Sequence, residues 1–266
     1  MFPTAKGTSF YSSLAVLVLI AVYELFSFFV FPSTFLYLAV LAVCAVVIIK
    51  NPKAGILAIL PAVMWFERYF TLNTLDIAGH SFKLYFLDFI LLFTFVGALV
   101  RLLKKELHWR LVSLDKALII FAVVVSAAYL HSFFAPGVDL SAAFGTFKNY
   151  LLYGIFFVLT VLLFRSKEEW QELISWFALG GLGLLFFLFF GLLNGGGGLW
   201  SEYTPLSTSG ARLIASTHTF YFLLFGFYLA GFYLFGERGK KSKNYLVYLL
   251  FSFTLVALTV SLIRHL

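Results

Sequence analysis

The chain has 266 residues, of which 62% are hydrophobic and only 12% are charged, and its mean hydropathy is +0.99. A soluble domain is about 45–50% apolar and about a quarter charged, so this composition excludes an ordinary water-soluble fold, a disordered chain and a secreted disulfide scaffold. The net charge is +7, but the Lys and Arg residues lie in short loops between apolar runs, which excludes a nucleic-acid-binding domain. The apolar residues are enough for about eight or nine bilayer crossings of roughly 20 residues each.

Nine apolar runs separated by polar loops predict nine membrane-spanning helices, because lipid cannot satisfy free backbone N–H and C=O groups. The first run lacks a small-residue cleavage site and leads directly into a second, which indicates a helix and not a removed signal peptide. The third run is the shortest and contains Pro61, and the cluster Gly180, Gly181 and Gly183 in the seventh predicts close helix packing. The nine runs are 10–31, 34–49, 54–66, 84–103, 117–134, 147–164, 171–193, 213–236 and 245–263.

The distribution of basic residues predicts the orientation of these helices. If the N-terminus is cytoplasmic and all nine runs cross, fourteen Lys and Arg residues lie inside and five lie outside, which is the distribution expected of a membrane protein. A re-entrant third run would weaken this bias, so we expect 54–66 to cross. The sequence therefore predicts a single integral-membrane domain over 1–266, an all-α polytopic bundle with a cytoplasmic N-terminus. Its outer cations are Arg68, Lys83, Lys148, Arg212 and Arg264.

The five outer cations all fall near one membrane–water boundary, where snorkelling to lipid phosphates would account for any one of them. As a set they indicate a site for a diphosphate, which needs several cations. Arg212 follows the polar residues 207–210 at the start of a helix, where free backbone N–H groups also favour an anion. His218, just beyond it, is the candidate base, and a histidine packed against a neighbouring hydroxyl is the alternative. His80 and His131 are weaker candidates.

Two carboxylates lie within the apolar runs. Glu24 is deep in the first run, where it indicates either an ion relay or a hydrogen bond between helices. Asp88 lies one turn into the fourth run, where we expect it to pair with an outer cation such as Lys83 and to play a structural part. The sequence has no phosphate-binding glycine loop, no zinc-protease motif, no carboxylate-rich calcium loop and a single cysteine, Cys44, so we expect neither a metal nor a cofactor.

Four stretches of the chain resemble the O-antigen ligase and polymerase family, membrane glycosyltransferases that act on undecaprenyl-diphosphate-linked glycans. The first is an aspartate-led helix that ends in a basic loop, the second carries a basic residue where the family commonly has one, and the third is a helix opened by an arginine. The fourth resembles the family's LT-x-SR ending, although here Leu262 and Ile263 separate Ser261 from Arg264. The stretches are KLYFLDFILLFTFVGALVRLLKK, FKNYLLYGIFFVLTVLLF, GARLIASTHTFYFLLFGFYLAGFYLF and LVALTVSLIRHL.

The resemblance implies metal-independent glycan transfer at the outer face of the bacterial inner membrane, from a lipid-linked oligosaccharide donor to a glycan or lipid acceptor. Arg212 and Arg264, supported by Lys148, would bind the donor diphosphate, and a base such as His218 would activate the acceptor hydroxyl. Family members are longer and carry a catalytic histidine in a later outer loop, so the resemblance implies that this chain corresponds to their N-terminal portion. The alternatives are an ion-coupled transporter of an anionic solute and a non-catalytic membrane scaffold.

Overall fold

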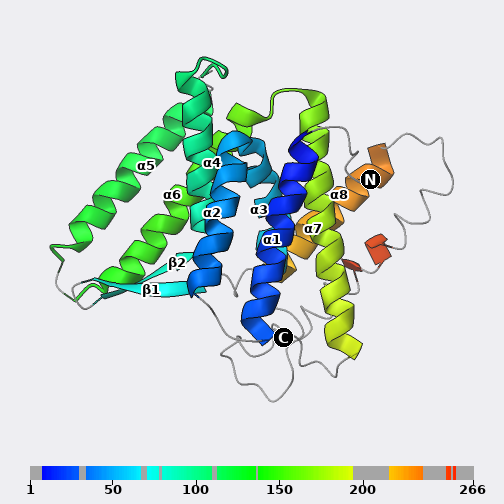
Figure 1. Cartoon of the computed structure of the whole chain (residues 1–266), viewed down its shortest axis with the longest axis horizontal. Coiled ribbons are helices and arrows are strands. Elements are labelled where there is room, and N and C mark those ends of the chain that lie inside the picture. The colour runs from blue at the N-terminus through cyan, green and yellow to red at the C-terminus, as the bar shows by residue number, and fades with distance from the viewer. Residues whose placement is uncertain are drawn as a thin grey trace. The chain divides into compact units, whose positions relative to one another are not determined.

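The computed structural model describes residues 8–29, 34–66, 71–77, 80–109, 113–135, 137–193, 216–235, 250–252 and 254–255. Within these ranges the chain is mostly helical, and one short β-hairpin interrupts the helices (Figure 1). The elements are α1 (Thr8–Phe29), α2 (Thr34–Lys50), α3 (Pro52–Phe66), β1 (Thr71–Ile77), β2 (His80–Tyr85), α4 (Phe86–Leu103), α5 (Ser113–Ser132), α6 (Leu140–Leu163), α7 (Lys167–Leu193) and α8 (Ser216–Phe235).

The predicted helical class is confirmed, and the first eight apolar runs each coincide with a helix. The ninth, 245–263, lies mostly outside the described residues. Two described helices, Phe86–Leu103 and Leu140–Leu163, are long and apolar enough to cross a membrane, and four apolar helical stretches are shorter. At 15 residues α3 spans only about 22 Å at 1.5 Å per residue. The bundle of nine crossings therefore stays a prediction, whereas the helices themselves are established.

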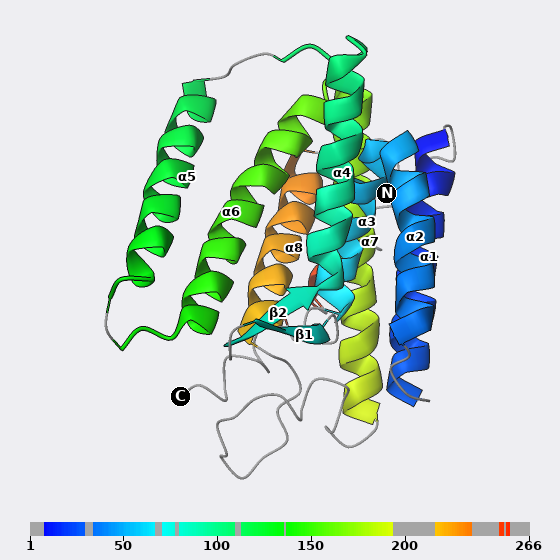
Figure 2. The same cartoon turned by 60° about the vertical axis from the view of Figure 1, so that its left-hand side comes forward.

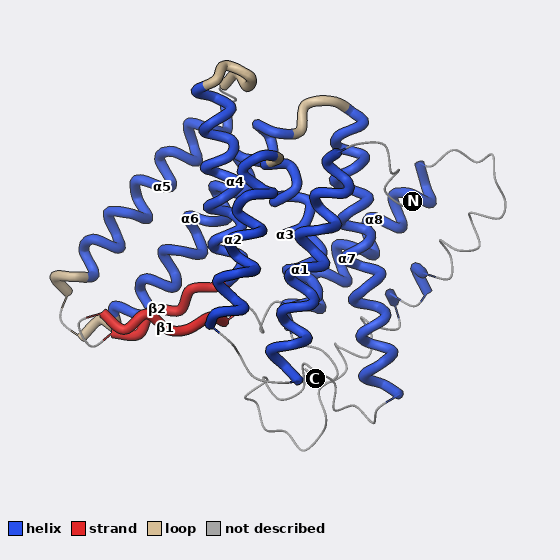
Figure 3. Tube along the Cα trace, viewed as in Figure 1, coloured by secondary structure: helices blue, strands red, loops and turns tan. Residues whose placement is uncertain are grey.

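The β-hairpin is the element that the helical prediction omitted. Strands β1 and β2 pair antiparallel, with Leu75 opposite Phe82 and Ile77 opposite His80, so two residues, 78 and 79, connect them. The hairpin occupies residues that we had placed in the loop before the fourth apolar run, and β2 continues to Tyr85, so the helix begins at Phe86 rather than at 84. Figure 3 shows both strands together beside the starts of α4 and α6.

The chain divides into two compact units, which are described separately. The N-terminal unit covers 3–174 and the C-terminal unit covers 175–266 together with the first two residues. In the C-terminal unit, Gly181 of α7 lies against the ring of Phe225 of α8, where an added Cβ would overlap the ring. The close helix packing expected of the glycine cluster is thus confirmed at Gly181. The prediction of one domain over the whole chain stays a prediction.

Helix α3 is the centre of the N-terminal unit, because it packs against α1, α2, α4 and α6. Its residues 54–58 include Ile56 and Leu57, which are completely buried. Two glycines let the helices approach closely here, as small residues do in membrane bundles. A Cβ on Gly97 of α4 would lie 3.0 Å from the backbone of Ile49 in α2, and a Cβ on Gly55 would overlap the hydroxyl of Thr94.

One end of the N-terminal unit, which we call the basic end, joins the ends of α2, α4 and α6 and the starts of α3 and α7. Arg101 donates a 2.6 Å hydrogen bond to the carbonyl of Lys50, and Lys53 forms an ion pair with Glu169. Ser166 and Glu169 form a capping box at the start of α7, since each side chain accepts from the other residue's backbone N–H. These hydrogen bonds and the ion pair bring together chain segments that the sequence predicts to be cytoplasmic.

Candidate anion-binding site at the hairpin end

The opposite end of the N-terminal unit, which we call the hairpin end, carries an acidic side chain in the first turn of α4. Asp88 accepts a 2.8 Å hydrogen bond at Oδ2 from the backbone N–H of Tyr85, the residue that precedes the helix. A carboxylate at this position satisfies a free N–H and interacts favourably with the positive end of the helix dipole. The local sequence, with Tyr85 at the junction of β2 and α4, thus fixes the direction of the Asp88 carboxylate.

Helix α6 brings Lys148 to the same carboxylate. The ammonium Nζ lies 2.6 Å from Asp88 Oδ2 and 4.1 Å from the centroid of the Tyr85 ring, so it is held by an ion pair and by a cation–π contact. The side chains of Lys148 and Asp88 are 8% and 14% exposed. A buried charge of this kind is stable only with a partner, because desolvation penalises an isolated ion by several kcal/mol.

The ion pair is neutral as a unit, and this limits what it can bind. The carboxylate of Asp88 already compensates the charge of Lys148, so an anion could bind this ammonium only in competition with Asp88. The pair also ties α4 to α6 across 60 residues of sequence. The pair therefore positions Lys148 and holds α4 and α6 together at the hairpin end.

The structure describes the side chains of only some of the predicted site residues. Lys148 is buried in the ion pair, and Lys83 belongs to β2, which contacts α6, although its side chain is outside the described residues. His218 lies in the first turn of α8 in the C-terminal unit, and its side chain is likewise not described. The remaining three predicted cations, Arg68, Arg212 and Arg264, lie outside the described residues.

The carboxylates can be compared with their predicted roles. Asp88 pairs with an outer cation, as expected, and the partner that the structure describes is Lys148. Glu24 lies in α1, and its side chain is outside the described residues. Tyr85 was missed by the sequence analysis. Its signal is the three-residue spacing to Asp88, the spacing of a helix cap to the third helical position.

The part of the chain that the structure describes contains no group of three or more His, Cys, Asp and Glu side chains that could hold a metal ion. No protein-family model, curated protein or solved structure matches this chain.

Proposed function

We propose that this protein is a glycosyltransferase of the O-antigen ligase and polymerase type, located in the bacterial inner membrane with its N-terminus in the cytoplasm. The transferred glycan would come from a polyprenyl-diphosphate donor and pass to a glycan or lipid acceptor. Support comes from the four stretches that resemble the family and from the apolar helices, two of which are long enough to cross a membrane. The gathering of Lys50, Lys53, Arg101 and Arg165 near one end of the N-terminal unit also fits the positive-inside distribution.

One observation favours a collective anion site over scattered snorkelling side chains. Lys148 points into the protein, where it is almost completely buried, whereas a snorkelling lysine extends towards the headgroups. Helix α6, which carries Lys148, contacts β2, which carries Lys83. Two of the five outer cations therefore belong to neighbouring elements at the hairpin end.

In this proposal Arg212 and Arg264 bind the donor diphosphate directly, because the planar guanidinium can hold two phosphate oxygens at once. Lys148, Arg68 and Lys83 complete the positive field that stabilises the charge developing on the leaving diphosphate. His218 would take the proton of the acceptor hydroxyl. The bond between the sugar and the diphosphate breaks as the bond to the acceptor oxygen forms, so the lipid diphosphate leaves with the negative charge.

The position of the Asp88–Lys148 pair also favours an enzyme over an ion-coupled transporter. Transporters bind their substrates near the membrane midplane, between broken helices. Here the carboxylate lies in the first turn of α4, and α4 and α6 are continuous helices. The buried charges are thus near one end of the bundle.

The test is glycan transfer by membranes that contain the whole protein, supplied with a polyprenyl-diphosphate-linked oligosaccharide and an acceptor. We expect Arg212→Ala and Arg264→Ala each to reduce transfer by about a hundredfold or more, the usual effect of removing a group that stabilises transition-state charge. Lys53→Ala, which removes a cation at the basic end, is the control and should retain activity. An immunoblot of the membranes checks that the variants insert equally. Unchanged product from both arginine variants would remove them from the site.

A further inference from the structure

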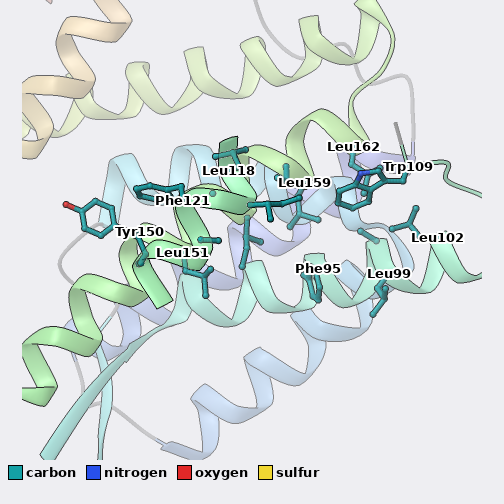
Figure 4. A pocket seen from close by; sticks show the side chains of 17 residues that line it. Phe95, Leu99, Leu102, Trp109, Leu118, Phe121, Tyr150, Leu151, Leu159 and Leu162 are labelled. Atoms are coloured by element: carbon teal, nitrogen blue, oxygen red, sulfur yellow. The ribbon is translucent and has the colours of Figure 1, made fainter. Parts of the chain in front are cut away.

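An apolar groove runs between α4, α5 and α6 in the N-terminal unit. It has a volume of about 480 Å³, within the usual range of about 300–1,000 Å³ for ligand pockets. Its walls are formed by residues 95–102 of α4, 118–125 of α5 and 150–162 of α6, together with Trp109. Figure 4 shows Trp109 beside Leu162 at one end of the groove and Tyr150 towards the other. The lining side chains are almost entirely hydrocarbon.

The groove exists because α5 packs mainly against α6 and leaves its other faces open (Figure 2). Helix α5 is apolar all round, since Ile119, Ile120, Phe121 and Val123 point in successive directions and are 43–65% exposed. A helix of this composition that is not buried in protein belongs in lipid. The groove therefore opens towards the hydrocarbon of a membrane and not towards water.

The groove lies nearer to the basic end than to the hairpin end. It uses the second half of α4, the middle of α5 and residues 150–162 towards the end of α6. From Tyr150 to Leu162 it follows α6 for about 18 Å at 1.5 Å per residue. One leaflet contributes about 15 Å to a hydrocarbon core of about 30 Å, so the groove matches the depth of a single leaflet.

The length and lining of the groove suit an extended hydrocarbon chain. The groove follows α6 for about 18 Å, and its lining side chains are almost entirely apolar. A transmembrane helix of a second copy is the alternative occupant, which the test below distinguishes.

The end of the groove at the basic end is positively charged. Lys104 and Lys105 follow α4 and are exposed, and Lys116 is exposed at the start of α5. Arg165 follows α6 and donates to the carbonyl of His108, the residue before Trp109, so its guanidinium lies beside this end of the groove. Glu106 is the acidic residue in the described part of the loop between α4 and α5. Positive charge at the level of a membrane surface attracts anionic headgroups.

We propose that the groove between α4, α5 and α6 binds one acyl chain of an anionic phospholipid from the cytoplasmic leaflet, with its headgroup phosphate held by Lys104, Lys105 and Lys116 beside Arg165. This site is separate from the hairpin end, where the proposed glycan transfer takes place. The orientation of the basic end towards the cytoplasm is the one proposed above.

Two glycines of α6 provide a matched test. An added Cβ at Gly154, which lines the groove, meets no atom within 4 Å, and the same is true at Gly145, which lies outside the groove on the same helix. Leucine at position 154 would therefore fill the groove without displacing a neighbouring helix, and leucine at 145 is the control. Ala122→Phe fills the groove from α5 and is a second, independent variant.

The purified protein would be equilibrated with vesicles of equal parts phosphatidylglycerol and phosphatidylcholine, and native mass spectrometry would then count the retained lipids. We expect one phosphatidylglycerol on the parent and on Gly145→Leu, and at least a tenfold loss of the lipid-bound species in Gly154→Leu and Ala122→Phe. A Lys104→Gln/Lys105→Gln double variant should retain a lipid but lose the preference for phosphatidylglycerol, whereas Lys50→Gln on α2 should keep it.

Circular dichroism establishes that each variant is folded. Equal lipid retention by folded Gly154→Leu and Gly145→Leu would overturn the proposal, as would a parent that retains no lipid. A dimer without lipid in the parent that becomes a monomer in Gly154→Leu would also overturn it, because a second copy would then be the occupant.

Discussion

The ion pair at the hairpin end yields a quantitative prediction, because a second ion pair at the basic end serves as its control. The perturbation is a double-mutant cycle on each pair. One cycle uses Lys148→Met, Asp88→Asn and the double variant, and the other uses Lys53→Met, Glu169→Gln and their double variant. Each cycle isolates the interaction between two side chains from the other effects of changing them.

The magnitudes follow from burial. The side chains of Lys148 and Asp88 are 8% and 14% exposed, and those of Lys53 and Glu169 are 23% and 29% exposed. Removing one member of a buried pair costs about 3–5 kcal/mol, because the other charge is left without a partner. Residues in contact couple by about 0.5–3 kcal/mol, and because this pair is buried we expect a value of about 2–3 kcal/mol at the hairpin end. Solvent screens the basic-end pair, so its coupling should be about 1 kcal/mol or less.

The assay is equilibrium unfolding of the purified protein in mixed micelles, followed by the loss of helical circular dichroism as the fraction of denaturing detergent rises. All variants share one micelle composition and one protein concentration. A hairpin-end coupling no larger than the basic-end coupling would refute the reasoning, because burial would then not decide the strength of these pairs. It would also mean that Asp88 does not hold Lys148 against a competing anion.

Two further predictions concern packing and pH. The free energy of unfolding should be about 1–3 kcal/mol lower for Gly97→Ala than for Gly145→Ala. Both variants gain helix propensity, but only Gly97→Ala forces a methyl group against the α2 backbone. Equal unfolding midpoints would contradict the close approach of α2 and α4. Burial raises the pKa of Glu169, but hydrogen bonds from Lys53 and from two backbone N–H groups outweigh it and hold the pKa below its ordinary value. The stabilising contribution of the Glu169 carboxylate should therefore be complete above about pH 4.5 and lost as the pH falls through the lowered pKa. If the parent and Glu169→Gln lost the same stability at low pH, Glu169 would not be the group responsible.

Much of the helical fold follows from apolar runs, and the errors have local causes. Helix α6 begins at Leu140, seven residues before the predicted start, because Asp139 caps it by accepting from the N–H of Ser141. Residues 141–143, 145 and 146 are small, and several of them are polar or only weakly apolar, so hydropathy alone did not include this segment. The sequence also contains a signal for the hairpin, because Gly79 lies in the two-residue connection between the strands that end at Ile77 and begin at His80.

The candidate site was less predictable than the helices, because its partners come from distant parts of the chain. Asp88 is close in sequence to Lys83, which made that lysine the obvious partner. The backbone changes from strand to helix at Phe86, and the packing of α6 against α4 and β2 brings Lys148 to Asp88. Hydropathy and charge counts report which side of a membrane a residue occupies. They contain no information on which helices become neighbours.

The links at the basic end have a consequence for the biosynthesis of the protein. Lys53 meets Glu169 across 116 residues, and the hydroxyl of Ser9 donates to Glu172 across 163 residues. Because translation releases the chain from its N-terminus, α1 and α3 leave the ribosome long before their partners in α7 exist. These early helices must wait for their partners during elongation, and a ribosome that stalls before residue 169 would leave them without these contacts and exposed to quality-control proteases.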